Sequence, residues 1–426
     1  MIENFCFLLD PSSKNLGKKR KLYGNKDATS PNCGFSVCGT RLRPLKPRAN
    51  LFGNANIEKP QLYCNHAKGI IMRIGYYFGA GISKESIPLA LDLPTRLAYL
   101  ANALELKFKF PEEMFDDAGD YIYGKKVSNL SKEMFADWRE IAEECRGIPI
   151  DTYAIENKDQ PKVLAKIKNV ISSYFLVEQS LDHSANIEEY DSKISPRIRN
   201  FLSQLIKSVD SPTQLFNNPI IFSWNYDNQF ELSFCKHIKS IYADEHKFRY
   251  ALKLLNIIPG NENFDTDIID IENTHTIIKL NGSAGYLVPT DTYRKWNHYG
   301  QYLAYQNTEE MILRAIRHYG ILKYSNLKIK NYIRFAFEKN GTINTYQRFV
   351  KDAASKIERL VVMGYSFPSD NNQIDSEVFE SMTNIKEAIL VDLSGRENIL
   401  LERFKNRMKK DIAVRFSSNV GEIPVY

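Results

Sequence analysis

The stretch FSWNYDNQFE, residues 222–231, places bulky and polar side chains at the exit from an apolar run. A chain that only needs to turn would use glycine, proline or serine there. Asn225 and Asp227 instead offer an amide and a carboxylate, which can orient a water or a hydroxyl and face a developing positive charge. The stretch therefore indicates a site where something is held. The alternative is a helix start in which Asp227 is the cap and Trp224 and Tyr226 belong to the core.

Three further apolar runs also end on glycine or polar residues. They lead into GAGIS (79–83), NGSAG (281–285) and GYSFPSD (364–370). Glycines at a strand exit let backbone amides approach a pyrophosphate, and the N-terminus of a following helix favours negative charge. An isolated GAG is equally typical of a tight turn without room for a Cβ. Because ligands of open parallel sheets bind beyond the carboxyl ends of the strands, the four segments are predicted to line one crevice.

A fifth apolar run, EAILVD (387–392), ends on Asp392. An acid at this position can accept hydrogen bonds from the ribose hydroxyls of a dinucleotide. The alternative is an ordinary helix N-cap before SGRENILL. Asp392 is kept as a candidate binding residue.

Short apolar runs alternate with amphipathic stretches from residue 70 onward, which is typical of an α/β fold. We predict a Rossmann-like open parallel sheet of about six strands with helices on both faces. The expected strands lie within 69–78, 219–224, 275–280, 359–364, 387–392 and 412–416, and the expected helices within 95–106, 161–181, 308–320 and 344–358. Between the first two strands lie about 140 residues of mostly helical pattern, which predicts an inserted helical lobe at about 95–215.

The basic charge is confined to the N-terminal part of the chain. Residues 1–70 hold 12 Lys and Arg against 4 Asp and Glu, a net +8, so the remainder carries −2 of the total +6. We predict a basic irregular segment at 1–66 and a nucleotide-binding domain at 67–426. The segment is interpreted as a solvated or protein-docking arm, with nucleic-acid phosphates as the alternative partner.

Cysteine usage and hydropathy narrow the class of protein. Six irregularly spaced cysteines indicate reduced thiols rather than a disulfide framework. Without an apolar stretch of eighteen residues or a signal-peptide pattern at the N-terminus, we expect a cytoplasmic protein without a membrane partner. Weak zinc-ligand candidates lie in the basic segment, where their spacing differs from that of structural zinc sites; they are Cys33, Cys38, Cys64 and His66.

The order GAGIS, NYD, KLNGS, GYSFP over residues 70–395 resembles the sirtuin-like family, in particular the NAD-consuming effectors of bacterial anti-phage defence. The resemblance implies that NAD is the substrate and that Asn225 and Asp227 flank the nicotinamide ribose. Trp224 and Tyr226 would wall the site from water. The other implied NAD-binding residues are Gly79, Ala80, Gly81 and Ser83 at the phosphates, Gly282 and Ser283 in the third motif, and Gly364, Tyr365 and Ser366 on the adenosine side.

The chain departs from the family at its third motif, where a histidine commonly serves as general base and Asn281 stands here. An amide does not take a proton at neutral pH, so a deacylase reaction is put in doubt, whereas hydrolysis by a positioned water remains compatible. His275 lies at the start of its strand. His298, on an expected loop, is a possible substitute or an ordinary surface histidine.

A second departure concerns zinc. Protein-deacylating sirtuins carry two Cys-x-x-Cys pairs, but the body of this chain offers only Cys145 and Cys235, far apart in sequence. A bound zinc ion is therefore not expected, and a protein deacylase is the weaker alternative. The defence branch of the family is expected to lack this metal.

The resemblance implies a regulated NAD hydrolase that yields nicotinamide and ADP-ribose and depletes NAD during anti-phage defence. The expected partners are further copies of the chain or a defence protein, such as an ATPase, a nucleic-acid-guided protein or a sensor. We expect them to dock on the helical lobe and the 308–358 helices, whose apolar faces exceed what one sheet needs. The alternative is a dinucleotide-binding sensor or scaffold in which Asn281 marks lost catalysis.

Overall fold

The computed structural model describes residues 72–112, 125–181, 194–206, 218–241, 255–258, 275–289, 297–298, 308–324, 329–338, 344–421 and 423–425. Residues Ile70–Tyr426 form one compact unit. The basic segment lies outside the described residues, together with Cys33, Cys38, Cys64 and His66. Its roles as a docking arm, nucleic-acid arm or zinc site therefore stay predictions.

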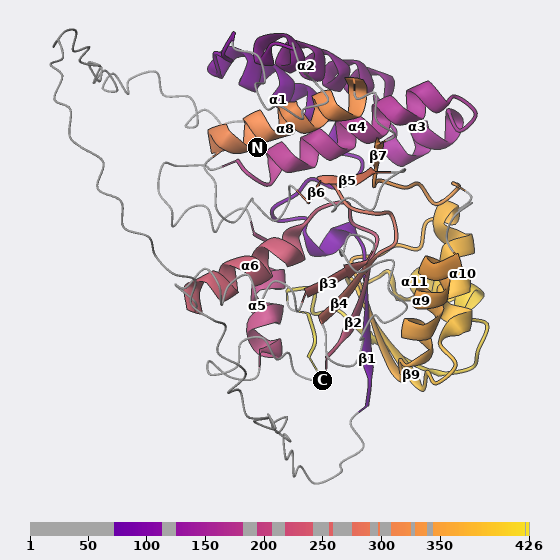
Figure 1. The fold of residues 1–426 in the computed structure, drawn as a ribbon. Helices are drawn as coiled ribbons and strands as arrows, with labels where there is room; N and C mark the ends of the chain where they lie inside the picture. The colour runs from indigo at the N-terminus through magenta and orange to yellow at the C-terminus, as the bar shows by residue number, and fades with distance from the viewer. Residues whose placement is uncertain are drawn as a thin grey trace, which may run out of the picture. The chain divides into compact units, whose positions relative to one another are not determined.

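A parallel sheet, to which the described residues contribute seven strands, forms the centre of this unit in the order β10-β9-β8-β1-β2-β4-β3 (Figure 1). The predicted α/β class and open parallel sheet are confirmed. Each of the six expected strands is present, and the short edge strand β3 adds a seventh. The bounds are β1 Ile74–Phe78, β2 Ile220–Ser223, β3 Leu255–Ile258, β4 His275–Lys279, β8 Arg359–Met363, β9 Glu387–Val391 and β10 Ala413–Ser417.

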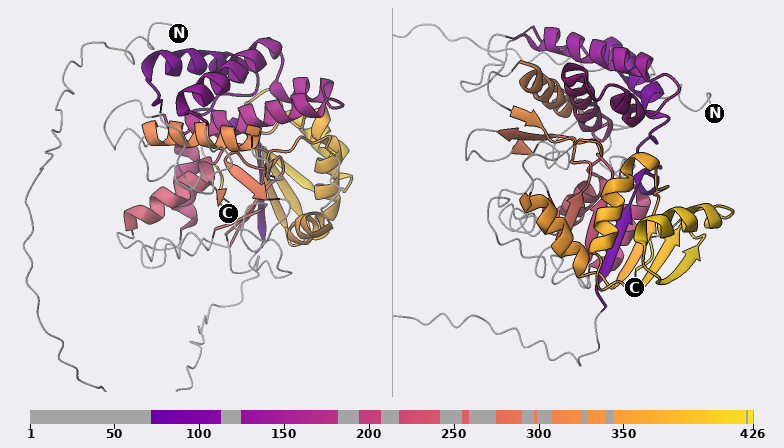
Figure 2. Two further views of the ribbon diagram at one scale, coloured as in Figure 1. Left: turned by 45° about the horizontal axis from the view of Figure 1, so that its top comes forward. Right: turned by 90° about the vertical axis from the view of Figure 1, so that its right-hand side faces the viewer.

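Successive side chains along a strand face opposite sides of the sheet. Because the side chains on both sides are apolar here, helices cover both faces. Tyr77 and Val362 pack toward α9 (Asn344–Ser355), α10 (Asn372–Ser381) and α11 (Glu397–Met408). On the other face, Tyr76 and Val361 pack toward α5 (Pro196–Leu205) and α6 (Gln229–Ile241). Figures 1 and 2 show these two helical layers with the sheet between them.

The inserted lobe contains α1 (Leu93–Lys107), α2 (Val127–Glu144), α3 (Ile150–Glu156) and α4 (Pro161–Glu178), joined by α8 (Thr308–Tyr324) from much later in the chain. Its core includes Trp138, whose indole NH donates to Ser173 Oγ at 2.9 Å. The predicted bounds of 95–215 need correction, because α5 packs on the sheet and α8 belongs to the lobe.

The apolar faces that the sequence suggested for docking are largely covered within the chain. Ile312, Ile316 and Tyr319 of α8 are buried in the lobe core, and α9 packs its apolar side against the sheet. The apolar side of α8 is therefore buried in the lobe core, and that of α9 is buried in the core on one face of the sheet. The prediction of partner docking thus loses the reason that supported it.

A small antiparallel sheet lies between the end of β4 and the lobe, in the order β6-β5-β7. It consists of β5 (Tyr286–Pro289), β6 (Asn297–His298) and β7 (Ile329–Asn331). His298 is therefore in a short strand rather than on the expected loop. Asn331 Nδ2 donates to the backbone oxygen of Lys168 in α4 at 2.8 Å, which ties this sheet to the lobe.

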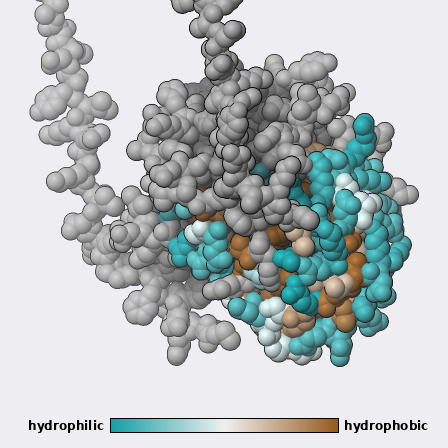
Figure 3. Space-filling view, turned by 90° about the horizontal axis from the view of Figure 1, so that it is seen from below, coloured by the Kyte–Doolittle hydropathy of each residue, from teal (hydrophilic) through white to brown (hydrophobic). Residues whose placement is uncertain are grey.

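The surface seen from below mixes hydrophobic and hydrophilic residues in its described part (Figure 3). None of the helices in the described ranges combines the length and the apolar character needed to cross a lipid bilayer.

Candidate functional site

The carboxyl ends of β1, β2 and β8 meet at the point where the order of the strands reverses. The chain builds β2, β3 and β4 on one side of β1 and then crosses to build β8, β9 and β10 on the other. Phe78 of β1 lies opposite both Ser223 and Met363, so the three strands end at one level. Such a switch point is where open α/β sheets bind ligands.

A cavity of about 700 Å³ lies at this edge, within the range of small-molecule sites. It is bounded by residues of the predicted segments and by lobe residues such as Thr152 and Phe175. The structure brings together these predicted residues: Gly79, Ala80, Gly81, Ser83, Trp224, Asn225, Tyr226, Asp227, Asn281, Gly364, Tyr365, Ser366 and Asp392. The predicted convergence of four segments on one crevice is therefore observed.

Gly282 and Ser283 are not among the cavity-lining residues, although both were expected to bind the ligand. Gly282 has φ +73°, and a Cβ there would lie 1.8 Å from the backbone oxygen of Tyr332. Ser283 Oγ donates to Asn228 Oδ1 at 2.6 Å in the buried interior. These two residues shape the turn that leads to β5. Of the NGSAG segment (281–285), only Asn281 lines the cavity.

Asn225 and Asn281 each carry a buried side-chain oxygen without a hydrogen-bond partner among the described residues. The two residues are only 6% and 7% exposed, and both line the cavity. Asn281 Nδ2 donates to the backbone oxygen of Trp224 at 3.3 Å, which directs its Oδ1 away from that contact. Buried polar atoms are nearly always paired in proteins, so two orphaned acceptors in one cavity indicate a place where a bound water or ligand donates hydrogen bonds.

Asp227 holds the turn that presents Asn225. Ser83 Oγ donates to Asp227 Oδ2 at 2.8 Å, and the backbone NH of Gln229 donates to Asp227 Oδ1 at 3.1 Å. Because the Ser83 hydroxyl hydrogen serves Asp227, its oxygen accepts from Asn225 Nδ2 at 3.4 Å. α6 begins at Gln229 and Asn228 precedes it as the N-cap, so Asp227 is not the cap itself, although it accepts from the first amide of the helix.

A buried ion pair supports the same turn from beneath. Lys279, the last residue of β4, lies 3.0 Å from Glu231 Oε1, with side chains only 2% and 3% exposed. Lys279 Nζ also donates to the backbone oxygen of Asp227. Burial raises the pKa of Glu231, while the charge of Lys279 lowers it. Sequence reasoning missed this pair, although a lysine within the apolar run HTIIKL was its visible signal.

The glycines of GAGIS are required by packing against β8. A Cβ on Gly79 would lie 2.4 Å from the backbone oxygen of Gly364, and one on Gly81 would lie 2.7 Å from the Gly364 Cα. Gly364 itself has φ +66°, a conformation that favours glycine. The tight-turn alternative therefore explains these residues.

The expected cradle of free backbone amides is not observed in this loop. The amides of Gly79 and Gly81 donate to Met363 and Gly364 backbone oxygens, and those of Ile82 and Ser83 donate within the loop. The segment forms a single 3₁₀ turn, Ala80–Ile82, and α1 begins only at Leu93. These four amides are therefore not available to a phosphate.

Arg197 of α5 supplies a cation at this part of the cavity that sequence reasoning missed. Its guanidinium donates to the backbone oxygen of Gly81 at 3.0 Å and pairs with Glu85 at 3.0 Å. Its Nε is buried and has no partner in the described part of the chain. It lines the cavity, so this N–H is a donor available to an anionic ligand.

Trp224 and Tyr365 form an aromatic wall with parallel rings 5.9 Å apart. Asp375 of α10 holds both of them, accepting from Tyr365 OH at 2.9 Å and from the Trp224 indole at 3.2 Å. Arg407 Nε also donates to Asp375 at 3.0 Å. Burial raises the pKa of Asp375 to about 6, although its donors act in the opposite direction. The wall is therefore fixed from the outer helical layer.

Tyr226 points from the motif into the lobe rather than across the cavity. Its hydroxyl donates to Asp151 Oδ1 of α3 at 2.8 Å, and its ring contacts Phe175 of α4. Gln179, just after α4, accepts at 2.7 Å from the backbone NH of Asn228. The motif thus joins the sheet to the lobe directly.

Asp392 lines the cavity but is engaged with its own turn. Its Oδ1 accepts from the Leu393 backbone NH at 2.7 Å, and its Oδ2 lies 3.2 Å from Arg396. Arg396, not Asp392, stands at the N-cap of α11, so the N-cap alternative does not hold. Leu393 is an exposed large hydrophobic residue beside it, as are Leu89 and Leu91 of the loop before α1, and all three line the cavity.

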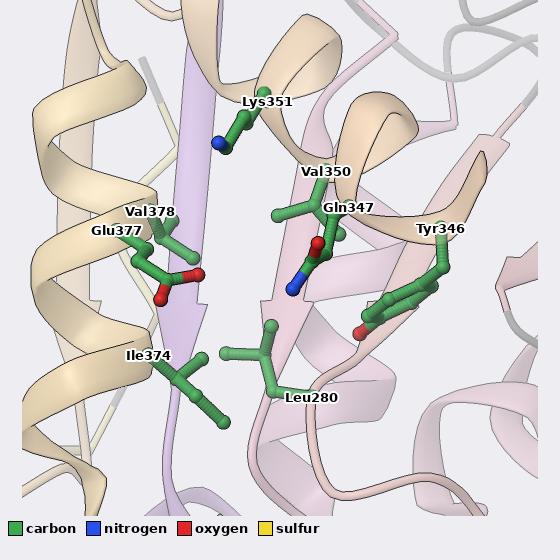
Figure 4. A pocket seen from close by; sticks show the side chains of 8 residues that line it. All are labelled: Leu280, Tyr346, Gln347, Val350, Lys351, Ile374, Glu377 and Val378. Carbon is green, nitrogen blue, oxygen red and sulfur yellow. The ribbon is translucent and has the colours of Figure 1, made fainter. Parts of the chain in front are cut away.

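A second hollow lies between α9 and α10, as Figure 4 shows, with Leu280 at its base and Lys351 and Glu377 along its sides. Its volume of about 40 Å³ has room for a few water molecules. A dinucleotide therefore fits only the larger cavity.

No histidine lines the larger cavity within the described residues, and no cluster of three or more metal-ligating side chains occurs among them. Burial raises the pKa of the Cys145 and Cys235 thiols to about 12, so both are inert at neutral pH. No model of a known protein family matches this sequence, and no curated protein matches it.

Proposed function

We propose that the protein is an NAD glycohydrolase that releases nicotinamide and leaves ADP-ribose. The observation that carries this proposal is the pair of orphaned acceptors, Asn225 Oδ1 and Asn281 Oδ1, in the cavity at the switch point of the sheet. NAD carries the donors they lack, in its ribose hydroxyls and its carboxamide. It also carries a pyrophosphate that Arg197 Nε can meet.

The chemistry suits a site without a strong nucleophile. Cleavage of the N-glycosidic bond passes through an oxocarbenium-like state, so fixed dipoles and negative charge around the ribose lower its energy. The oxygens of Asn225 and Asn281 are such dipoles, and the carboxylate of Asp227 lies in the same turn. The aromatic wall of Trp224 and Tyr365 excludes water from one side.

Regulation belongs to the proposal because unrestrained loss of NAD is toxic to a cell. The cavity is lined from both the sheet and the lobe, so a shift between them changes its shape. The setting in anti-phage defence, and a trigger by self-assembly or by a defence partner, rest on the motif resemblance alone.

A second candidate is a dinucleotide-binding sensor or scaffold. It is favoured by the absence of a histidine from the described cavity lining and by the amide at position 281. Such a protein would bind NAD without breaking it.

Nicotinamide release from NAD, followed by chromatography, separates the two candidates. The wild type should release nicotinamide and Asn225→Ala should lose at least about 100-fold in rate, as for an oxyanion-type contact. Asn129→Ala, at an exposed asparagine of α2, is the matched control and should retain the wild-type rate. Calorimetric binding of NAD without release, under every activating condition, would favour the sensor instead.

A further inference from the structure

Asp151 is a cavity-lining carboxylate that the motif resemblance does not assign. It is the second residue of α3, in the helical lobe, and is partly buried. Its Oδ1 accepts the hydroxyl of Tyr226 at 2.8 Å. Because Tyr226 lies between Asn225 and Asp227 in the chain, this bond attaches the lobe carboxylate to the stretch that carries the proposed site.

The second oxygen of Asp151 is not committed to the fold. Oδ2 accepts no hydrogen bond from any described residue, while Oδ1 is held by Tyr226. The Tyr226 ring is itself fixed against Phe175. The carboxylate is therefore oriented through one oxygen and has the other available to the cavity. Burial raises the pKa of Asp151, and the nearby carboxylate of Asp370 raises it further.

The other acids of the cavity are less suited to act on a substrate. Asp227 already accepts from Ser83 and from the Gln229 backbone NH. Asp392 is paired with Arg396, and Asp92 and Asp370 are exposed to solvent. Asn281 has no proton affinity at neutral pH. Asp151 is left as the acid of the described cavity lining that is oriented, partly desolvated and unpaired at one oxygen.

We propose that Asp151 is the general base of the site, taking the proton of the water that attacks the ribose. This inference rests on the proposed NAD hydrolysis. The bond between ribose C1′ and the nicotinamide ring nitrogen breaks, and its electron pair neutralises the ring. A water oxygen bonds to C1′, its proton passes to Asp151 Oδ2, and bulk solvent then removes it.

The assignment explains how the chain works without the histidine of its third motif. The base comes from the inserted lobe rather than from β4, so the site is complete only when the lobe is seated on the sheet. Tyr226 serves as the positioning residue, because it contacts Asp151 and not the reacting atoms.

Steady-state kinetics of nicotinamide release by the full-length protein test the proposal. Asp151→Asn should lower kcat by at least about 100-fold, as expected for loss of a general base, and change KM by less than about threefold. Asp159→Asn makes the same substitution at an exposed acid of the lobe and should behave as wild type. Tyr226→Phe keeps the carboxylate but frees it, and should lower kcat by about tenfold with KM unchanged.

Chemical rescue separates a base from a structural contact. Formate supplies a small carboxylate, so Asp151→Ala should regain activity in proportion to formate concentration, whereas Asn225→Ala should not. An Asp151→Asn variant as active as wild type would overturn the assignment and leave NAD hydrolysis standing. Loss of NAD binding in Asp151→Ala, without rescue, would also overturn it by showing a structural role. A wild type that releases no nicotinamide under any condition would overturn both proposals.

Discussion

The helical lobe and the parallel sheet bury polar groups in different ways. The lobe core buries a neutral imidazole: Ser172 Oγ lies 2.8 Å from the buried His318 Nε2 and accepts from the Gly285 backbone NH at 3.0 Å. Its ion pair between α1 and α4, Arg96–Glu178, keeps the arginine partly exposed. The sheet layer buries both partners of its ion pairs, in Lys279–Glu231 and in Asp375 with Arg407. The cavity lies between them and draws its walls from both.

Acid should affect the stability of the two regions in opposite directions. Burial lowers the pKa of His318 to about 3, so the lobe core accommodates only the neutral ring. Burial raises the pKa of Asp375 to about 6, so the sheet layer tolerates its protonation. Mild acid should therefore loosen the lobe before it loosens the sheet, and four variants examine that comparison.

The largest effect is expected from Lys279→Met in the sheet. Removing the cation leaves Glu231 buried without its partner, which should cost about 3–5 kcal/mol in the free energy of unfolding. Urea denaturation measures this loss. Lys351→Met, at an exposed lysine of α9, should change stability by less than about 0.5 kcal/mol. Equal effects of the two substitutions would show that the buried pair does not support the sheet.

His318→Gln should remove the acid sensitivity of the lobe. The pKa of His318 is lower in the folded state than the usual 6.5, so its contribution to stability is present above pH 6.5 and is lost as pH falls toward 3. Glutamine keeps an acceptor for Ser172 but does not titrate. Protection factors for amide exchange in α4 and α8, which correct for the intrinsic pH dependence of exchange, should fall in the wild type between pH 7 and 5 and stay nearly constant in the variant. A wild-type α4 with the same protection at pH 5 as at pH 7 would contradict the prediction.

Asp375→Asn should reveal the opposite slope in the sheet layer. The folded-state pKa lies above 3.8, so this group's contribution to stability is greatest below pH 3.8 and declines as pH rises through about 6. The stability of wild type relative to the variant should therefore decrease between pH 4 and 6. Thermal unfolding across this range measures the difference. If the contribution of Asp375 to stability increased with pH, as that of His318 does, the two regions would not respond to acid in opposite directions.

Arg396→Gln should have the smallest effect. Its pair with Asp392 is partly exposed, and such pairs contribute about 0–1 kcal/mol. The variant should unfold within about 1 kcal/mol of wild type, and added salt should reduce the difference further. If Arg396→Gln lowered the free energy of unfolding as much as Lys279→Met, exposed and buried ion pairs would contribute equally to the stability of this sheet.

The main sheet was predictable because buried parallel strands leave apolar runs, as in RLVVMG and EAILVD. Strand β3 was missed because its four residues, LNII, lack any flanking signal, and α8 was misplaced because periodicity says nothing about which core an amphipathic face joins. Residues near the cavity followed from their position at strand ends. Asp151 and Arg197 were missed because helices far away in sequence supply them, and a lone acid or arginine on a helix carries no local pattern.

The pairing of β1 with β8 has a consequence for how the protein is made. Ile74 pairs with Arg359, and the cavity needs Gly364 beyond that strand. A chain emerging from the ribosome holds β1 and the lobe helices α1–α4 long before β8 exists, so β1 lacks one of its two neighbouring strands through most of translation. An unfinished polypeptide thus lacks one wall of the pocket, and the cavity is complete only as synthesis nears its end.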